Sequence, residues 1–309
     1  LDHTILTNKF LNFWKPRIAI FVESEIWPSM FKSIESKNIP LILLNARLTK
    51  KTFKRWIKIK YFSKSIFEKI TIAYPQNIET KEFLKKLNTI KINSIGNLKF
   101  AENPENNLDK ITNSLRSQLK KRKIWIASST HKNEEIFCAK THIELSKKFK
   151  NLLTIIIPRH VHRAKDIACE IRKLNLNVTF HSSNKKNINK IDIYIVDTFG
   201  ETKKFHKIAC SVFLGGSIIE RGGQNPLEAA RYGANIYHGK NIDNFKDVYK
   251  LLKSFGISKR ISTPKELASS IIFKKNKYTG IKIKNMGAKI LKKTIKELDS
   301  IINNETQKA

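Results

Sequence analysis

The chain has 309 residues and a formal net charge of +34, because 60 Lys and Arg face only 26 Asp and Glu. This length suits two domains, and such a charge first suggests nucleic acid or an anionic membrane surface as partner. The lysines are spread along the whole chain, however, so they do not indicate a dedicated nucleic-acid role. Three cysteines without CxxC spacing argue for a reducing compartment and against zinc. No apolar run reaches the roughly 18 residues of a membrane helix, and no signal peptide is visible.

Short apolar runs typical of buried parallel strands occur in the first hundred residues. The predicted strands are residues 18–22, 41–44, 71–73 and 90–95, with a helix at 29–37. Glu23 follows the first strand, Arg47 the second and Lys99 the fourth. Because open α/β sheets bind ligands at the carboxyl ends of their strands, these residues are candidates for a site. In a purely structural interpretation, Glu23 pairs with Arg47 and Lys99 is an ordinary surface lysine.

Residues 50–69 form a basic amphipathic segment in which aromatic and aliphatic side chains alternate with lysines. One interpretation is a helix that packs its apolar side on the core and exposes its lysines. The other is a patch that binds lipid or phosphate head groups. The sequence alone leaves both open.

A polar stretch without periodicity, residues 101–109, is the predicted domain boundary. Beyond it strands and helices alternate, which predicts a parallel, doubly wound sheet. The predicted strands are 124–127, 152–157, 176–180, 191–196, 211–214 and 235–237, and the helices are 134–149 and 162–174. Residues 264–308 are expected to be mostly basic amphipathic helix.

Glycine is concentrated between residues 200 and 239, which hold seven of the chain's 11 glycines. Glycine lets a loop bend sharply and approach a ligand closely. After this loop, Asn225 is expected to cap a helix, with Pro226 at its first position and Glu228 at its third. Such a helix start suits a phosphate, although a structural capping box fits the same residues.

Other polar residues also follow predicted strands of the second domain. Arg159 is suited to bidentate contact with a phosphate. Thr198 and Glu201 would cap a helix, which leaves the N–H groups of Phe199 and Gly200 for a ligand. The chain has no HExxH, GxSxG or P-loop motif and no Asp-x-Asp pair for a nucleotide-bound metal, so neither a cofactor nor a metal is expected.

Seven motifs, taken together, resemble one family, the 3-deoxy-D-manno-octulosonic acid (Kdo) transferases of lipopolysaccharide assembly. In chain order they are ESEIWP (23–28), NARLT (45–49), GNLKF (96–100), SSTHKNEE (128–135), IIIPRH (155–160), VDTFGE (196–201) and GGSIIERGGQNPLEAA (215–230).

The resemblance implies an α/β fold of the GT-B type, with two Rossmann-like domains facing a cleft and the N-terminal one incomplete. Residues 1–100 would form the acceptor-side domain, and residues 101–309 would form the CMP-sugar-binding domain with the C-terminal helices. The implied reaction is an inverting, metal-independent transfer of Kdo from CMP-Kdo to a lipid A precursor, lipid IVA. It would occur on the anionic cytoplasmic face of the inner membrane, to which the protein would bind peripherally.

The resemblance also assigns site residues by motif. Glu23 and Lys99 would stabilise the transition state, and Glu228 would bind the ribose. The CMP moiety would be held by Pro158, Arg159, Phe199, Gly200, Glu201, Asn225, Pro226, Leu227 and Glu228. Cations on the CMP side are suited to this reaction, because negative charge grows there on the departing phosphate.

One departure from the family concerns the general base. Family members carry an N-terminal membrane anchor and then a Gly-Glu motif whose Glu resembles a general base, and this sequence contains neither. We expect a loss of roughly a hundred residues, the size of a small domain. Because a positioned general base contributes about 10² to 10⁴ in rate, this chain alone should be severely impaired.

Three alternatives remain open at this stage. The chain could be a catalytically impaired remnant that binds a CMP-sugar without transferring it, or a GT-B enzyme that uses a UDP-sugar. A nucleic-acid binder is the third, and it predicts tight binding with a steep dependence on salt.

Overall fold

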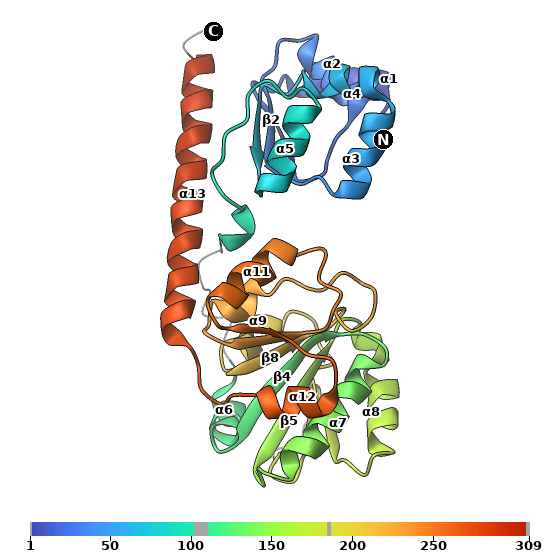
Figure 1. The fold of residues 1–309 in the computed structure, drawn as a ribbon, viewed down its shortest axis with the longest axis vertical. Coiled ribbons are helices and arrows are strands. Elements are labelled where there is room, and N and C mark those ends of the chain that lie inside the picture. The colour runs from blue at the N-terminus through green and yellow to red at the C-terminus, as the bar shows by residue number, and fades with distance from the viewer. Residues whose placement is uncertain (1, 102–110, 184–186, 307–309) are drawn as a thin grey trace. The chain divides into compact units, whose positions relative to one another are not determined.

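The computed structural model describes residues 2–101, 111–183 and 187–306, the last three by their backbone alone. The chain divides into two compact units, which Figure 1 colours along the sequence: unit 1 comprises Leu1–Glu102 and Met286–Ala309, and unit 2 comprises Asn103–Asn285. The predicted boundary segment, residues 101–109, lies outside the described residues except for Ala101.

The end of the chain belongs to unit 1, whereas we expected all C-terminal helices in the second domain. Helix α13 spans Lys277–Thr306, and its part from Met286 onward groups with unit 1. Leu298 and Ile301 pack against a buried cluster that includes Ile42. The Tyr74 hydroxyl donates to the Glu297 carboxylate at 3.1 Å. The apolar period of a helix shows that it packs, but it does not show on which domain.

Unit 1 contains a three-stranded parallel sheet in the order β1-β2-β3. The strands are β1 (Ala19–Val22), β2 (Leu41–Ala46) and β3 (Ile72–Pro75). The helices are α1 (Thr4–Trp14), α2 (Pro28–Glu35), α3 (Lys50–Lys58), α4 (Lys60–Phe67) and α5 (Ile78–Lys86), followed by the 3-10 turn η1 (Leu98–Phe100). The strand predicted at 90–95 is wrong: only an isolated parallel bridge joins Ile92 to Ala73.

The basic amphipathic segment is two helices, α3 and α4, which meet at Ile59. Ile66 and Phe67 of α4 are fully buried in the core, as the structural interpretation requires. Tyr61, in contrast, is 92% exposed, and Ile59 and Phe62 are exposed as well. The segment therefore has a core side and a separate exposed apolar surface. Among the described residues, no helix combines the length and the apolar character that crossing a bilayer would need.

Unit 2 is built on a seven-stranded, all-parallel sheet in the order β10-β9-β8-β4-β5-β7-β6. Its strands are β4 (Lys123–Thr130), β5 (Leu152–Pro158), β6 (Val178–Phe180), β7 (Ile193–Ile195), β8 (Ser211–Leu214), β9 (Asn235–His238) and β10 (Ser258–Arg260). Its helices are α6 (Asn113–Lys120), α7 (Glu134–Ser146), η2 (Val161–Arg163), α8 (Ala164–Arg172), α9 (Thr202–His206), α10 (Leu227–Ala230), α11 (Lys246–Ser254) and α12 (Pro264–Ser270).

Six of the seven strands of unit 2, all except β10, were predictable because they are largely buried on both faces of the sheet. All seven residues of β5 are buried, and Trp125 and Phe213 on β4 and β8 are fully enclosed. Such strands read as continuous apolar runs in the sequence. The order also reverses at β4, because β5 lies on one side of it and β8 on the other. Open α/β sheets bind ligands beyond the carboxyl ends of the strands at such a switch point.

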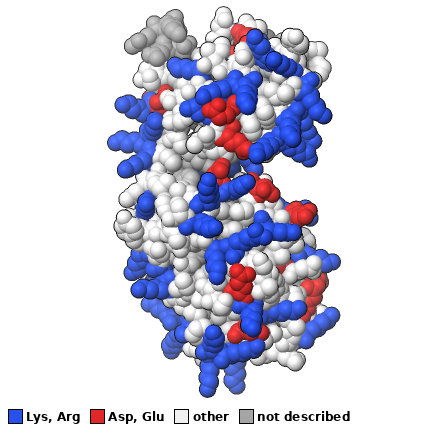
Figure 2. All heavy atoms as spheres, viewed as in Figure 1, with Lys and Arg blue, Asp and Glu red and all other residues white. Residues whose placement is uncertain are grey.

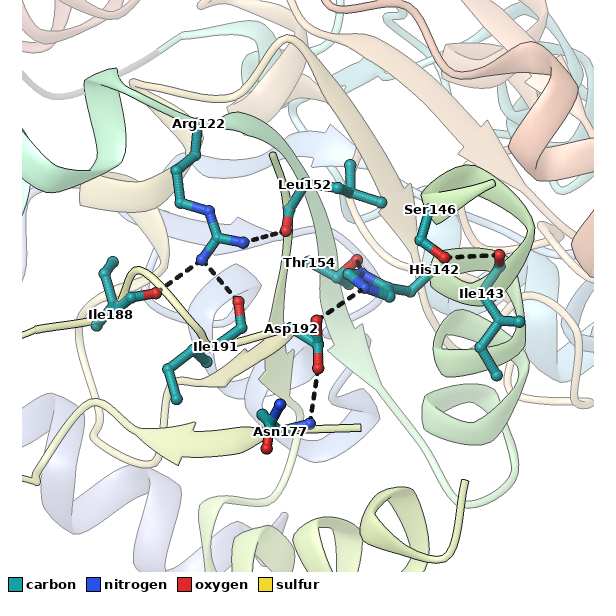
Figure 3. A network of polar contacts seen from close by, with 10 residues as sticks. All are labelled: Arg122, His142, Ile143, Ser146, Leu152, Thr154, Asn177, Ile188, Ile191 and Asp192. Carbon is teal, nitrogen blue, oxygen red and sulfur yellow. Dashed lines mark hydrogen bonds and ion pairs between the residues drawn. The ribbon is translucent and has the colours of Figure 1, made fainter. Parts of the chain in front are cut away.

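At the amino ends of these strands, Arg122 connects three segments of the chain by hydrogen bonds (Figure 3). Its guanidinium donates to the carbonyl of Ile188 at 2.8 Å, to that of Ile191 at 2.6 Å and to that of Leu152. Asp192 lies in the same network, where it accepts from the Asn177 N–H at 2.8 Å. Burial favours the neutral acid, but His142, the Asn177 N–H and Arg122 together hold the pKa of Asp192 below its ordinary value.

We expect Arg122→Gln to lower the free energy of unfolding of unit 2 by about 2–4 kcal/mol, because three carbonyl groups lose a charged donor. Hydrogen exchange of β5 and β7 peptides in increasing urea measures this loss. Lys121→Gln, at the exposed neighbouring position, is the matched control. Equal stability of the two variants would contradict the role given to the guanidinium.

Candidate functional site

The loop after β8 is held from inside by a buried carboxylate. Glu134, at the start of α7, is fully buried. It accepts from the backbone N–H groups of Gly216, Ser217 and Ile218 at 2.7, 3.1 and 3.0 Å. It also accepts from the His131 N–H at 3.0 Å. These glycine-loop amides therefore bind an internal carboxylate, which fixes the loop without a ligand.

Gly215 shows how closely this loop approaches β4. A Cβ atom there would lie 2.4 Å from the carbonyl oxygen of Ser129, which no real side chain tolerates. Glycine is required at this position by close backbone packing, not by contact with a ligand. The sequence motif contains Glu134, but its role was not predicted, because three of its four N–H partners lie more than 80 residues further along the chain.

The helix predicted after the glycine loop begins one residue late and is short. Helix α10 runs over Leu227–Ala230 with Pro226 at the N-cap, and the Asn225 side chain accepts from the Leu227 N–H at 3.1 Å. The structural interpretation required Glu228 to close a capping box onto Asn225, and it does not do so. Its carboxylate instead lies 3.5 Å from Nδ1 of His206. A helix of four residues also supplies less dipole to a phosphate than we expected.

His206 is a site residue that the sequence did not reveal. It ends α9 and is 2% exposed. Its Nε2 lies 3.0 Å from the Ser128 hydroxyl on β4, and its Nδ1 faces Glu228. Contact with His206 is the main reason why the pKa of Glu228 is lowered, although burial acts in the opposite direction. Glu228 is therefore held as a carboxylate, an acceptor for hydroxyl groups.

The segment after β7 also differs from its predicted cap. Helix α9 begins at Thr202, and Glu201 at its N-cap makes no side-chain cap bond. The Glu201 carboxylate accepts from Lys204 at 2.8 Å and lies 3.7 Å from Nε2 of His181. Gly200 has a φ of +81°, which favours glycine, and the Phe199 side chain is 81% exposed. An exposed aromatic ring at the end of a strand is free to stack on a base.

Pro158 ends β5, which pairs with β4, and Arg159 directly follows it. Pro158 is buried as the last residue of the strand, and the Arg159 N–H donates to the Thr130 carbonyl at 2.9 Å. The Arg159 side chain is exposed. The His131 and His160 rings lie 5.8 Å apart nearby. Burial lowers the pKa of His131, and the charges of Arg159 and Arg221 act in the same direction, against that of Glu134. The nine candidate CMP ligands thus lie at or beyond the carboxyl ends of β5, β7 and β8, in one unit.

In unit 1, the two predicted catalytic residues form an ion pair. Lys99 Nζ lies 2.9 Å from Glu23 Oε1, and both side chains are partly buried. The structural interpretation of Lys99 as an ordinary surface lysine is therefore wrong. The Glu23 carbonyl accepts from the Arg47 N–H at 3.1 Å. Glu23 directly follows β1 with a φ of +59°, an unusual conformation for a residue with a side chain.

Asn45, at the end of β2, places the segment that carries Lys99. It has a φ of +49°, and its side-chain oxygen accepts from the Leu98 N–H at 3.0 Å. Asn97 then accepts from the Lys99 N–H at 2.9 Å. Within the described part of the chain, no three or more His, Cys, Asp or Glu side chains are arranged to hold a metal ion.

Comparisons with known proteins agree with the motifs. The family model described as 3-Deoxy-D-manno-octulosonic-acid transferase (kdotransferase) matches residues 1–102. The 3-deoxy-D-manno-octulosonic acid transferase of Haemophilus influenzae is 32% identical over 255 residues, which is 82% of this chain and 60% of that protein. The transferase of the same name from Rickettsia bellii is 32% identical over 294 residues, which is 94% of this chain and 69% of that protein.

A solved structure of a glycosyltransferase from Rickettsia africae matches with a TM-score of 0.57 and 12% identity, over 97% of this chain and 81% of that one. This likeness concerns the fold, and together with the two parallel sheets it confirms the predicted GT-B class. The chain spans 60% of the length of its Haemophilus influenzae relative. From these relatives and the matching family model, the chain belongs to the 3-deoxy-D-manno-octulosonic acid transferase family.

Proposed function

We propose that this chain takes part in an inverting, metal-independent transfer of Kdo from CMP-Kdo to lipid IVA in lipopolysaccharide synthesis. Unit 2 would bind the donor through the CMP moiety, and unit 1 would contribute Glu23 and Lys99 to the chemistry. The observation that carries the proposal is the arrangement of Arg159, Phe199 and Glu228 beyond the carboxyl ends of strands in one parallel sheet, in a chain of this family.

Each residue at this rim has a chemical task in the proposal. The exposed guanidinium of Arg159 binds the phosphate, and its charge stabilises CMP as it departs. The carboxylate of Glu228 accepts from the ribose hydroxyls, and the lowered pKa of Glu228 keeps it ionised. Phe199 stacks on the cytosine. In this scheme protein cations, not a divalent metal, neutralise the leaving phosphate.

Glu23 and Lys99 are proposed to stabilise the charges that develop during transfer. The sugar becomes oxocarbenium-like, so the Glu23 carboxylate steadies positive charge while Lys99 faces negative charge. Their ion pair of 2.9 Å keeps both groups oriented before substrate binds. Groups that are fixed in place need no reorganisation at the moment of reaction.

Because the proposed acceptor is a lipid, we also propose that unit 1 binds peripherally to the anionic cytoplasmic face of the inner membrane. Figure 2 shows Lys and Arg side chains spread over unit 1, where acidic residues are fewer. The α3–α4 segment exposes three apolar side chains, Ile59, Tyr61 and Phe62, and lysines adjoin them in the sequence. Apolar groups surrounded by lysines are typical of a surface that binds anionic lipid.

We expect Glu228→Gln to weaken CMP binding to the chain roughly 10- to 100-fold, since a hydrogen bond to a charged group is worth about 1.5–3 kcal/mol. Isothermal titration calorimetry with CMP measures the change. Glu220→Gln, at an exposed position of the same loop, is the control and should bind like the parent chain. Parallel titration with UMP tests the donor: tighter binding of UMP than of CMP would overturn the nucleotide assignment.

We expect Glu23→Gln and Lys99→Met each to lower the rate of Kdo transfer about 10² to 10³-fold without changing CMP affinity, because they act on the transition state. Transfer of labelled Kdo from CMP-Kdo to lipid IVA measures the rate. Lys69→Met, which removes the Lys69–Glu35 ion pair in the same unit, should leave it unchanged. If the parent chain binds CMP but transfers no Kdo, it is a binding remnant and the catalytic proposal fails.

The double variant Ile59→Ser/Tyr61→Ser should bind vesicles that contain phosphatidylglycerol about tenfold or more weakly, because two apolar side chains no longer enter the bilayer interface. Co-sedimentation with vesicles at low and high salt measures the partition. Tyr278→Ser/Ile281→Ser removes two side chains of the same types, both more than half exposed, from unit 2 and is the control. Equal loss in both double variants would contradict a specific membrane surface on unit 1.

A further inference from the structure

Unit 2 contains a cavity of about 480 Å³ at the edge opposite the proposed CMP rim. Lys123 at the start of β4 and Cys210 just before β8 both line it. In a parallel sheet all strands begin on one side and end on the opposite side. The cavity lies where β4 and β8 begin and the rim lies where the strands end, so the two are separate sites. The volume falls in the range of about 300–1,000 Å³ that is typical of small-molecule sites.

The lining is strongly cationic. It includes Arg116, Lys120, Arg122, Lys123, Lys207 and Lys275, and none of its described residues is acidic. Burial lowers the pKa of both Arg122 and Lys275, since each is partly removed from water. The acid that acts most on Arg122 is Asp192, whose carboxylate already accepts from the Asn177 N–H. Positive charge is thus gathered in a partly desolvated space, where an anion would be stabilised.

Several of these cations already have partners inside the protein. Arg122 donates to three carbonyl groups, and Lys275 Nζ donates to the Lys207 carbonyl. The Lys123 ammonium lies 3.9 Å from the ring centre of Phe149 and 5.6 Å from that of Phe273. The side chains of Arg116 and Lys120 on α6, by contrast, make no hydrogen bond or ion pair with other residues that the structure describes. Within the part of the chain that the structure describes, these two side chains are therefore available to a ligand.

The remainder of the lining is apolar. Leu119 and Phe273 lie beside the cations, together with Ile124 and Ile208. A ligand that fills this space must therefore carry an apolar portion next to its charge. Inorganic phosphate alone would leave that part of the cavity unfilled.

We propose that this cavity binds a phosphate group attached to an apolar portion, with Arg116 and Lys120 on the phosphate and Leu119 and Phe273 on the apolar portion. A soluble phosphomonoester and an anionic phospholipid share this chemistry. Nothing in the proposal requires that the chain transfers Kdo or binds CMP.

Cys210 provides a direct reporter of occupancy. It is half-buried in the cavity lining, whereas Cys169 is exposed on α8 and Cys138 is buried. Burial raises the pKa of the Cys210 thiol, so alkylation by N-ethylmaleimide is measured under mildly alkaline conditions by peptide mass spectrometry. Hexyl phosphate at about ten times its Kd should slow alkylation of Cys210 roughly tenfold, because about nine tenths of the sites are filled. Alkylation of Cys169 should not change.

Three comparisons complete the test. Arg116→Gln/Lys120→Gln should abolish the protection. Lys165→Gln/Lys173→Gln makes the same change of net charge at two exposed positions, on α8 and directly after it, and should retain the protection. In a separate arm, vesicles of phosphatidylglycerol replace hexyl phosphate. If the vesicles protect Cys210 from alkylation and hexyl phosphate does not, the phosphate source is a lipid. Absence of protection by both hexyl phosphate and vesicles, or equal protection in the two double variants, would overturn the proposal. CMP titration of each variant separates these outcomes from failure of the CMP site.

Discussion

The rim of unit 2 depends on one buried carboxylate. Glu134 accepts four backbone N–H groups, three of them from consecutive residues of the glycine loop. A buried carboxyl group is tolerated only when its oxygens are hydrogen-bonded, and consecutive N–H groups that point the same way form a good site for carboxylate oxygens. Here the carboxylate and the loop N–H groups satisfy each other, which holds the loop in place. Ser217 extends this order, since its hydroxyl donates to the Leu214 carbonyl and accepts from the Gly239 N–H at 2.9 Å.

Because Glu134 fixes the glycine loop, the residues that follow the loop are held in a defined position. Residues 225–228 follow the loop, and there Glu228 meets His206, which is itself held by Ser128 at the end of β4. The result is a connected set of side chains from three segments of unit 2. In our proposal this set presents an ionised carboxylate to the ribose, while Arg159, placed by its backbone bond to Thr130, faces the phosphate. Positioning of this kind lets a protein stabilise charge without moving.

The sequence predicted the strands that are continuous apolar runs. It did not predict features that depend on contacts between residues far apart in the chain. Strands such as β5, buried along their whole length, were found within a residue or two. Strand β10 was missed, because Ser258–Arg260 is polar and is a strand only through its pairing with β9. The pairing of Glu23 with Lys99 was also missed, since 76 residues separate them and local pattern says nothing about such contacts. His206 looks like an ordinary residue of a short basic helix, and only the fold brings it to Glu228.

A structure of the chain determined with CMP bound is the most direct measurement of the central claim. We predict the phosphate within hydrogen-bonding distance of the Arg159 guanidinium and the ribose hydroxyls on the Glu228 carboxylate, with the Glu134-bound loop unchanged. Nucleotide bound away from the carboxyl ends of β5, β7 and β8, with that rim empty, would contradict it.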